Sequence, residues 1–94
     1  MRNRSEQYNE AVKLAREVFL RKNLEYGDSI RFGGGLSACY NIVGPAMRLI
    51  PIVFHSKDHG LSNSKIVRGI LIDILNYAAI GLFFMSEGNW LGEE

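Results

Sequence analysis

The chain has a single cysteine, Cys39, and only two prolines among its 94 residues. One cysteine excludes an internal disulfide and any zinc site built from several thiolates. An excess of charge of one sign is also lacking, because eleven basic residues face ten acidic ones and give a formal net charge of +1. That balance gives no strong field toward nucleic acid or an anionic membrane. The length allows one domain, residues 1–94, and excludes separate cofactor and substrate domains.

A secretory signal is also lacking, because the basic N-terminus runs into an acidic amphipathic segment and not into an apolar stretch. Together with the free Cys39, which we expect to be a small buried side chain, this predicts a cytoplasmic protein. So short a chain buries only about 60–65% of its unfolded surface, which leaves a lone protomer marginally stable. We therefore expect a homo-oligomer, a dimer or a tetramer.

Helical periodicity is what the sequence does contain. From residue 5 to residue 24, apolar side chains recur at steps of three and four, which predicts a helix with Ser5 as its N-cap. Its buried stripe is expected to comprise Tyr8, Ala11, Val12, Ala15, Val18 and Phe19. The three glycines at 33–35 predict a loop, because consecutive glycines lose much backbone entropy in a helix.

Two further helices are expected, at residues 36–54 and 64–85. Pro45 and Pro51 should kink or split the first of them, and Ser62 or Asn63 can cap the second. No segment alternates strictly between apolar and polar residues, so we predict an all-α domain, a compact bundle of three main helices. The glycine-containing tail, residues 86–94, is expected to fray.

The last helix is also about as long as a bilayer is thick, which raises the alternative of a membrane span. Arg68, Asp73 and Asn76 interrupt its apolar run. A carboxylate at the middle of a span costs about 2.5 kcal/mol in lipid. We therefore favour a central core helix, shared across a subunit interface, over a small membrane protein, and we expect no membrane partner.

Two polar clusters carry the candidate chemistry. One is the segment 22–29, Lys-Asn-Leu-Glu-Tyr-Gly-Asp-Ser, which by itself has the composition of a helix end with a glycine stop. The other is Asp73, Asn76 and Tyr77, which share one helix face because they stand at i, i+3 and i+4. A carboxylate in an apolar helix is costly unless it is paired or binds a cation. Spacing alone leaves both alternatives open: a salt bridge to Arg48 or Arg31, or a ligand for a divalent cation such as Mg²⁺.

These residues resemble a known family. Lys-Asn-x-Glu-Tyr-Gly-Asp-Ser, then Arg48-Leu49, then Asp-x-x-Asn-Tyr-Ala at 73–78 is similar in order and spacing to the nucleotide-modification-associated domain of type 1 of phages and bacteria. The likeness covers residues 19–82. In organisation the chain more distantly resembles the all-α, MazG-like nucleotide pyrophosphohydrolases.

The resemblance implies a domain that binds a nucleoside triphosphate or a modified nucleotide and hydrolyses the bond between its α and β phosphates with Mg²⁺. It implies no direct binding of DNA. The implied metal ligands and catalytic carboxylates are Glu25, Asp28 and Asp73. The implied substrate-binding side chains are cations for the phosphates and polar or aromatic groups for the rest of the nucleotide: Lys22, Tyr26, Arg31, Arg48, Asn76 and Tyr77.

The sequence also departs from that family. Gly44-Pro45 stands where the family has Asp-Lys, and Lys65 and Gly69 stand where it has acidic residues. Fewer carboxylates weaken the expectation of metal-dependent hydrolysis more than that of the fold. The alternative is a non-catalytic helical interaction module of a phage or DNA-modification system. His55 and His59, at i and i+4, lack a third ligand nearby, and we expect them to be solvated.

Overall fold

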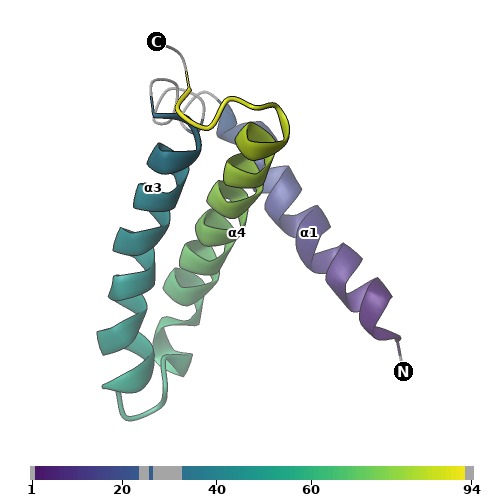
Figure 1. Cartoon of the computed structure of the whole chain (residues 1–94). Coiled ribbons are helices and arrows are strands. Elements are labelled where there is room, and N and C mark those ends of the chain that lie inside the picture. The colour runs from purple at the N-terminus through teal and green to yellow at the C-terminus, as the bar shows by residue number, and fades with distance from the viewer. Residues whose placement is uncertain (1, 24–25, 27–32, 93–94) are drawn as a thin grey trace.

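The computed structural model describes residues 2–23, 26 and 33–92. These residues form three long helices and two short helical turns, without a strand among them (Figure 1). The elements are α1 (Arg4–Arg21), α3 (Gly34–Leu49), the π-helical turn η1 (Ile50–Phe54), the 3-10 turn η2 (Leu61–Asn63) and α4 (Ser64–Ser86). The predictions of an all-α fold and of three main helices are confirmed.

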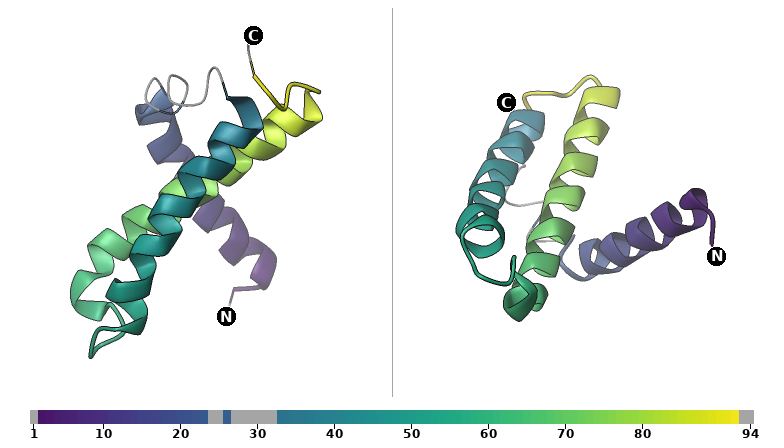
Figure 2. Two further views of the ribbon diagram at one scale, coloured as in Figure 1. Left: turned by 60° about the vertical axis from the view of Figure 1, so that its left-hand side comes forward. Right: turned by 90° about the horizontal axis from the view of Figure 1, so that it is seen from below.

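Helices α3 and α4 lie antiparallel, side by side, and α1 crosses α4 and then points away from the pair (Figure 2). The buried core is small and centres on Tyr26, Ala38 and Ile80, with Phe19, Tyr77 and Phe84 packed against it. Ala38 is fully buried, and Gly81 faces it across the α3–α4 contact. Two small residues thus let these helices approach closely.

The start of α1 differs from the prediction, because Asn3 and not Ser5 is the N-cap. Asn3 has an extended backbone, and its Oδ1 accepts a hydrogen bond of 2.8 Å from the backbone N–H of Glu6. Of the predicted buried stripe, only Ala15 is fully buried, and Tyr8 is largely exposed. The reason is the crossing geometry, since α1 diverges from α4 on either side of their contact.

The glycine segment is wrongly predicted as a loop at two of its three positions. Gly34 and Gly35 are the first residues of α3, and both are buried. The backbone N–H of Gly35 donates to the carbonyl of Trp90 at 2.7 Å, and a Cβ on Gly35 would collide with the Trp90 ring. The glycines therefore serve a close contact between the start of α3 and the tail. The tail was expected to fray, but as far as Gly92 it turns back onto α3.

The second predicted helix is split, as expected, although only one proline splits it. Pro45 lies inside α3 without ending it, whereas Pro51 is the second residue of the π-helical turn that follows Leu49. Proline has no N–H to donate to the preceding turn, and at Pro51 the α-helical hydrogen-bond pattern gives way to the wider π-helical one. Cys39, predicted to be buried, is exposed because no described element covers the outer face of α3.

The predicted bounds of the last helix are confirmed to within one residue, since α4 begins at Ser64 and ends at Ser86 with Asn63 at the N-cap position. By length and composition alone, the stretches Gly34–Phe54 and Leu61–Ser86 could each cross a membrane. The same test is passed by core helices of soluble proteins, so these stretches do not decide between the two environments.

Candidate functional site

A chain of hydrogen bonds joins the two predicted polar clusters. The hydroxyl of Tyr26, from the first cluster, donates to Oδ1 of Asp73 on α4 at 2.7 Å. Nδ2 of Asn76 lies 3.2 Å from the Tyr26 oxygen and 3.0 Å from the carbonyl oxygen of Ala15 on α1. Residues that lie about fifty positions apart in the sequence therefore share one site, where α1 crosses α4.

The direction of these bonds follows from the groups involved. An amide nitrogen can only donate, so Asn76 donates to the lone pairs of the Tyr26 oxygen. The single proton of the phenol is then directed to the Asp73 carboxylate, which only accepts when ionised. The cluster consequently has a fixed polarity, from Asn76 through Tyr26 to Asp73.

Burial and aromatic packing hold the phenol in place. Tyr26 is 3% exposed, and its ring stacks on Phe19 at a centroid distance of 5.4 Å and meets Tyr77 edge-on at 5.1 Å. Burial, with the hydrogen bond to Asp73, raises the pKa of the Tyr26 phenol to about 12. Tyr26 is therefore a neutral hydrogen-bond donor at physiological pH and not a proton acceptor.

Asp73 does not pair with Arg48, one of the two arginines named by the salt-bridge interpretation, and the other, Arg31, lies outside the described residues. Among residues 2–23, 26 and 33–92 the ion pair present joins Arg2 to Glu10, far from this site. The Asp73 carboxylate is instead stabilised by the phenol. A carboxylate offers about four lone-pair positions and Tyr26 uses one of them, so Asp73 can accept further donors.

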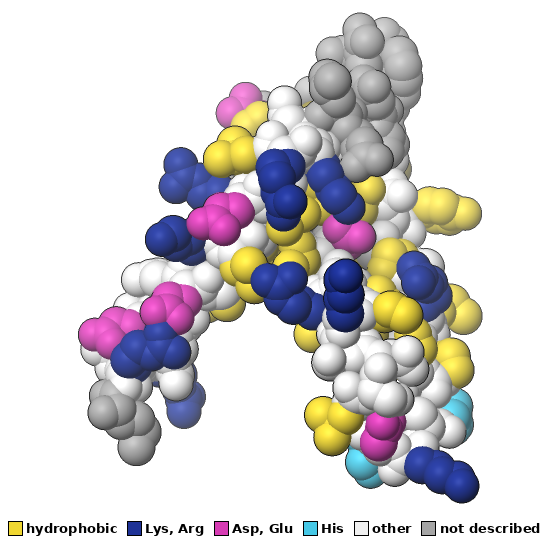
Figure 3. Space-filling view, turned by 180° about the vertical axis from the view of Figure 1, so that it is seen from behind, with side chains coloured by type: hydrophobic (Ala, Val, Ile, Leu, Met, Phe, Trp, Pro, Cys, Tyr) yellow, Lys and Arg dark blue, Asp and Glu magenta, His cyan; other side chains and the backbone are white. Residues whose placement is uncertain are grey.

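The other predicted site residues fall into two groups. Lys22 and Arg48 are exposed, and Tyr77 is half-buried beside Tyr26. The predicted residues Glu25, Asp28 and Arg31 lie outside the described residues. Figure 3 shows lysine and arginine side chains gathered on the rear face of the molecule, around the region where α1 meets the helical pair. This face suits an anion, even though the net charge of the whole chain is close to zero.

The described residues do not by themselves make a metal site. Within that part of the chain, no three His, Cys, Asp or Glu side chains are grouped closely enough to hold one ion. The cluster contributes one carboxylate, Asp73, and Mg²⁺ is bound through several oxygen ligands. A magnesium site would therefore depend on Glu25 and Asp28, and we derive no reaction step through a metal.

Two residues of the site were absent from the predicted set. The carbonyl of Ala15 accepts from Asn76, and the ring of Phe19 stacks on Tyr26. Both belong to the predicted apolar stripe of the first helix. The signal that could have marked Ala15 is its small side chain, which allows a neighbouring helix to approach the backbone.

A cavity of about 810 Å³ opens beside the cluster, between α1 and the C-terminal half of α4. Tyr26 and Asn76 form part of its wall. Most of the remaining wall is apolar, with Val12 and Phe19 from α1 and Leu82 and Phe83 from α4. The polar cluster thus lies at the edge of an apolar space and is not enclosed by the core.

Comparison of the chain with protein-family models, with curated proteins and with solved structures finds no match.

Proposed function

We propose that this chain is a nucleotide-binding domain, related to the nucleotide-modification-associated domain of type 1 and more distantly to the MazG-like proteins, that works as a cytoplasmic homo-oligomer. The observation that supports it most is the hydrogen bond between Tyr26 and Asp73. Tyr26 belongs to the Tyr-Gly motif and Asp73 to the late-helix motif, the two motifs on which the resemblance rests. A shared site would explain why both occur in one sequence.

The chemistry of the surroundings is compatible with such a ligand. A nucleotide presents a polyanion, which cations such as Lys22 and Arg48 can bind, and a flat base, which aromatic rings can stack on. Phe19 and Phe83 supply rings at the cavity wall, and Asn76 supplies an amide. Within the proposal, Tyr26 keeps the Asp73 carboxylate in position, and Asn76 keeps Tyr26 in position.

Hydrolysis is the further step that the family resemblance implies. The pyrophosphohydrolase reaction would require Mg²⁺, and the described residues supply only Asp73 toward it. We therefore propose nucleotide binding as the function and treat hydrolysis of a (d)NTP as a measurable extension. A helical interaction module without catalysis is the alternative.

The length of the two apolar stretches favours a second candidate, a membrane hairpin, but the position of α1 argues against it. Asn76 lies at the middle of α4 and bonds to Ala15 of α1. Lys13, Arg16 and Glu17 are close neighbours of Ala15 in the sequence. If α4 crossed a bilayer, these charges would lie near its midplane, at a cost of several kcal/mol.

The test is the thermal melting of the full chain with a panel of dNTPs, with and without Mg²⁺. A nucleotide at one hundred times its dissociation constant stabilises a protein by about 2.7 kcal/mol, which is a shift of several degrees for a chain of this size. Asp73→Asn, which keeps the side-chain volume, should raise the dissociation constant of the nucleotide at least about tenfold and so reduce this shift, because a donating amide nitrogen replaces an accepting carboxylate oxygen. Pyrophosphate release, measured in parallel, reports hydrolysis separately.

The matched control is Asp58→Asn, the same substitution at the tip of the hairpin, where Asp58 bonds only to its own turn. This variant should keep the nucleotide-dependent shift. If no nucleotide raises the melting temperature of the wild-type protein, the interaction module replaces the nucleotide-binding domain as the proposal.

A further inference from the structure

The surface of the chain is too large for its mass. A folded monomer of 10.6 kDa is expected to expose about 5,500 Å², and this chain exposes 7195 Å². The radius of gyration is 14.8 Å, against roughly 12 Å for a compact domain of 94 residues. The excess area, about 1,700 Å², is twice what one partner contributes to an interface of standard size. The protomer therefore has the surface of a protein that associates.

One apolar seam on α4 has the pattern of an unpaired coiled-coil helix. Steps of four and three separate its members, Leu71, Leu75, Ala78, Leu82 and Met85. Such a repeat keeps one face of a helix turned toward a partner helix. Leu82 is 65% exposed and Leu71 and Met85 are more than half exposed, so no described element of the same chain fills this seam.

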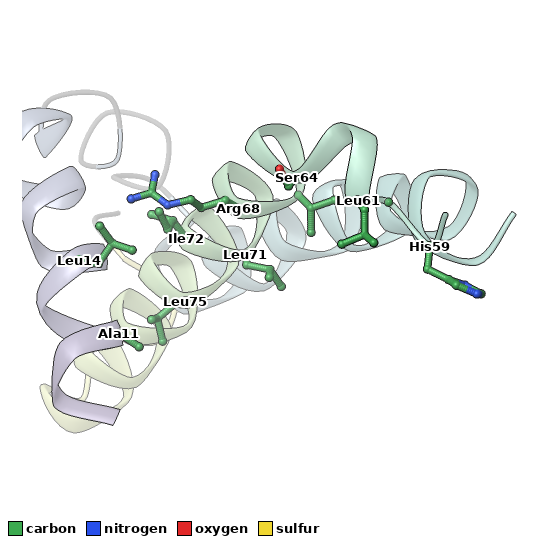
Figure 4. Close-up of a pocket in the computed structure, with 11 residues that line it drawn as sticks. Ala11, Leu14, His59, Leu61, Ser64, Arg68, Leu71, Ile72 and Leu75 are labelled. Carbon is green, nitrogen blue, oxygen red and sulfur yellow. The ribbon is translucent and has the colours of Figure 1, made fainter. Parts of the chain in front are cut away.

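The seam runs past two cavities that lie on opposite sides of the contact between Ala15 of α1 and Asn76 of α4. The 810 Å³ cavity follows the C-terminal half of α4, and a second cavity of about 410 Å³ follows its N-terminal half. In this second cavity Leu14 of α1 lies opposite Ile72 of α4, and Ala11 lies opposite Leu75 (Figure 4). Leu75 lines both cavities, Leu71 lines the second, and Ala78 and Leu82 line the first. A partner helix on the seam therefore lies over the outer face of α4 and not inside either cavity.

The charges at the two ends of α4 select the direction of the partner helix. Lys65 and Arg68 lie near its N-terminus, the first turn has no acidic residue, and the last turn has no basic residue before the C-cap Glu87. This arrangement opposes the helix dipole at both ends. An antiparallel copy of α4 would bring the basic N-terminal end of each helix to the carbonyl-rich, acidic C-terminal end of the other. A parallel copy would place like charges together.

We infer that the exposed seam of α4 pairs with the same seam of a second copy of this chain, antiparallel, about a two-fold axis that passes near Ala78. The symmetry then sets the pairs: Ala78 faces Ala78 of the second copy, Leu75 faces Leu82, and Leu71 faces Met85. The small side chain of Ala78 lets the two helices approach most closely at the axis. This inference specifies the homo-oligomer of the proposed function.

Cysteine cross-linking tests the pairing directly. In a Cys39→Ser background, Ala78→Cys should form a disulfide-linked dimer on mild oxidation, because the two Cα atoms at the axis come within disulfide reach. Leu71→Cys alone should not, whereas Leu71→Cys with Met85→Cys in one chain should. Cross-linking of Leu71→Cys to itself would show a parallel pair and would overturn the inference.

Sedimentation or light scattering, which measures the oligomeric state, tests whether the α4 seam holds the dimer together. Leu82→Glu should raise the dissociation constant of the dimer at least about 100-fold, because two carboxylates would be buried without partners. The control is Met47→Glu at an equally exposed position of α3, which should leave this dimer intact. A monomeric wild-type protein, a need for detergent, or dissociation by Met47→Glu alone would overturn the inference.

The nucleotide-dependent melting shift distinguishes a failure of the proposed dimer interface from a failure of the proposed nucleotide binding. If Ala78→Cys fails to cross-link in a protein that binds a nucleotide, only the interface is wrong. If it cross-links in a protein that binds none, only the proposed function is wrong.

Discussion

The crossing of α1 with α4 and the outer faces of α3 and α4 are opposite in character. At the crossing, a polar side chain is buried: Asn76 is 4% exposed and bonds to Ala15 and Tyr26. On the outer faces, large apolar side chains are exposed, with Tyr40 on α3 at 80%. In most soluble domains polar groups are mainly outside and large apolar groups mainly inside. The protomer thus satisfies its buried polar groups but leaves its apolar surface uncovered.

This difference shows which contacts depend on the protomer alone. Among the described residues, every buried polar side-chain atom has a hydrogen-bond partner. The crossing is therefore complete within one chain. Exposed apolar seams of this extent are typical of surfaces that become buried on association. Mutations at the crossing should act on the folding of the protomer, whereas mutations on the outer faces should act on its assembly.

The largest effect should come from breaking the crossing with Asn76→Leu. The substitution leaves the carbonyl of Ala15 and the lone pairs of Tyr26 without their donor in a buried place. We expect the free energy of unfolding to fall by about 2–4 kcal/mol. Urea denaturation followed by circular dichroism measures the change.

The matched control is Asn41→Leu on α3. The Asn41 amide donates to the carbonyl of Ser37 within the same helix, so its loss separates no two elements. We expect a change of less than about 1 kcal/mol for this variant. Equal losses at the two positions would mean that the crossing contributes nothing particular to stability.

Tyr26→Phe should have an intermediate effect on the free energy of unfolding, and the size of this effect should depend on pH. The variant loses the donor to Asp73, at a cost of about 1 kcal/mol near neutral pH. The pKa of Tyr26 is about 12 in the folded chain and 10.0 when unperturbed. A raised folded pKa means that the phenol's contribution is complete below pH 10 and is lost as the pH rises toward 12.

Unfolding free energies measured from pH 9 upward check this prediction. The wild-type protein should lose more stability than Tyr26→Phe over this range, and an absorbance titration should show one late-ionising tyrosine missing in the variant. Parallel pH profiles for the two proteins would contradict the assignment of a buried, hydrogen-bonded phenol.

Much of the fold could be predicted from the sequence because helical periodicity is local. The repeat of apolar residues gave α4 to within one residue of its end, and Pro51 marked the split of the second helix. The errors arose where a distant segment decides the local structure. Gly35 enters a helix because Trp90, far along the chain, packs on it. Cys39 is exposed because nothing within the described chain covers the outer face of α3.

Four residues of the cluster, Tyr26, Asp73, Asn76 and Tyr77, belong to the predicted set, but the bonds between them could not be predicted. The spacing of Asp73, Asn76 and Tyr77 correctly put them on one helix. The partner of Asp73 could not be read from the sequence, which offered Arg48, Arg31 or a cation. The described partner is the phenol of Tyr26, and this contact depends on how distant segments pack.

The smallest effect should appear at Gly69, in the helix one turn before Asp73. A Cβ added there meets no atom within 4 Å, whereas at Gly35 it would collide with Trp90. Gly69→Ala should therefore raise the free energy of unfolding by about 0.5–1 kcal/mol, because alanine loses less backbone entropy in a helix. Thermal melting measures the gain, and Gly35→Ala, which should lower stability, is the comparison. A loss of stability in Gly69→Ala would show that this stretch of α4 is covered in solution, which would place a second contact surface beside Asp73.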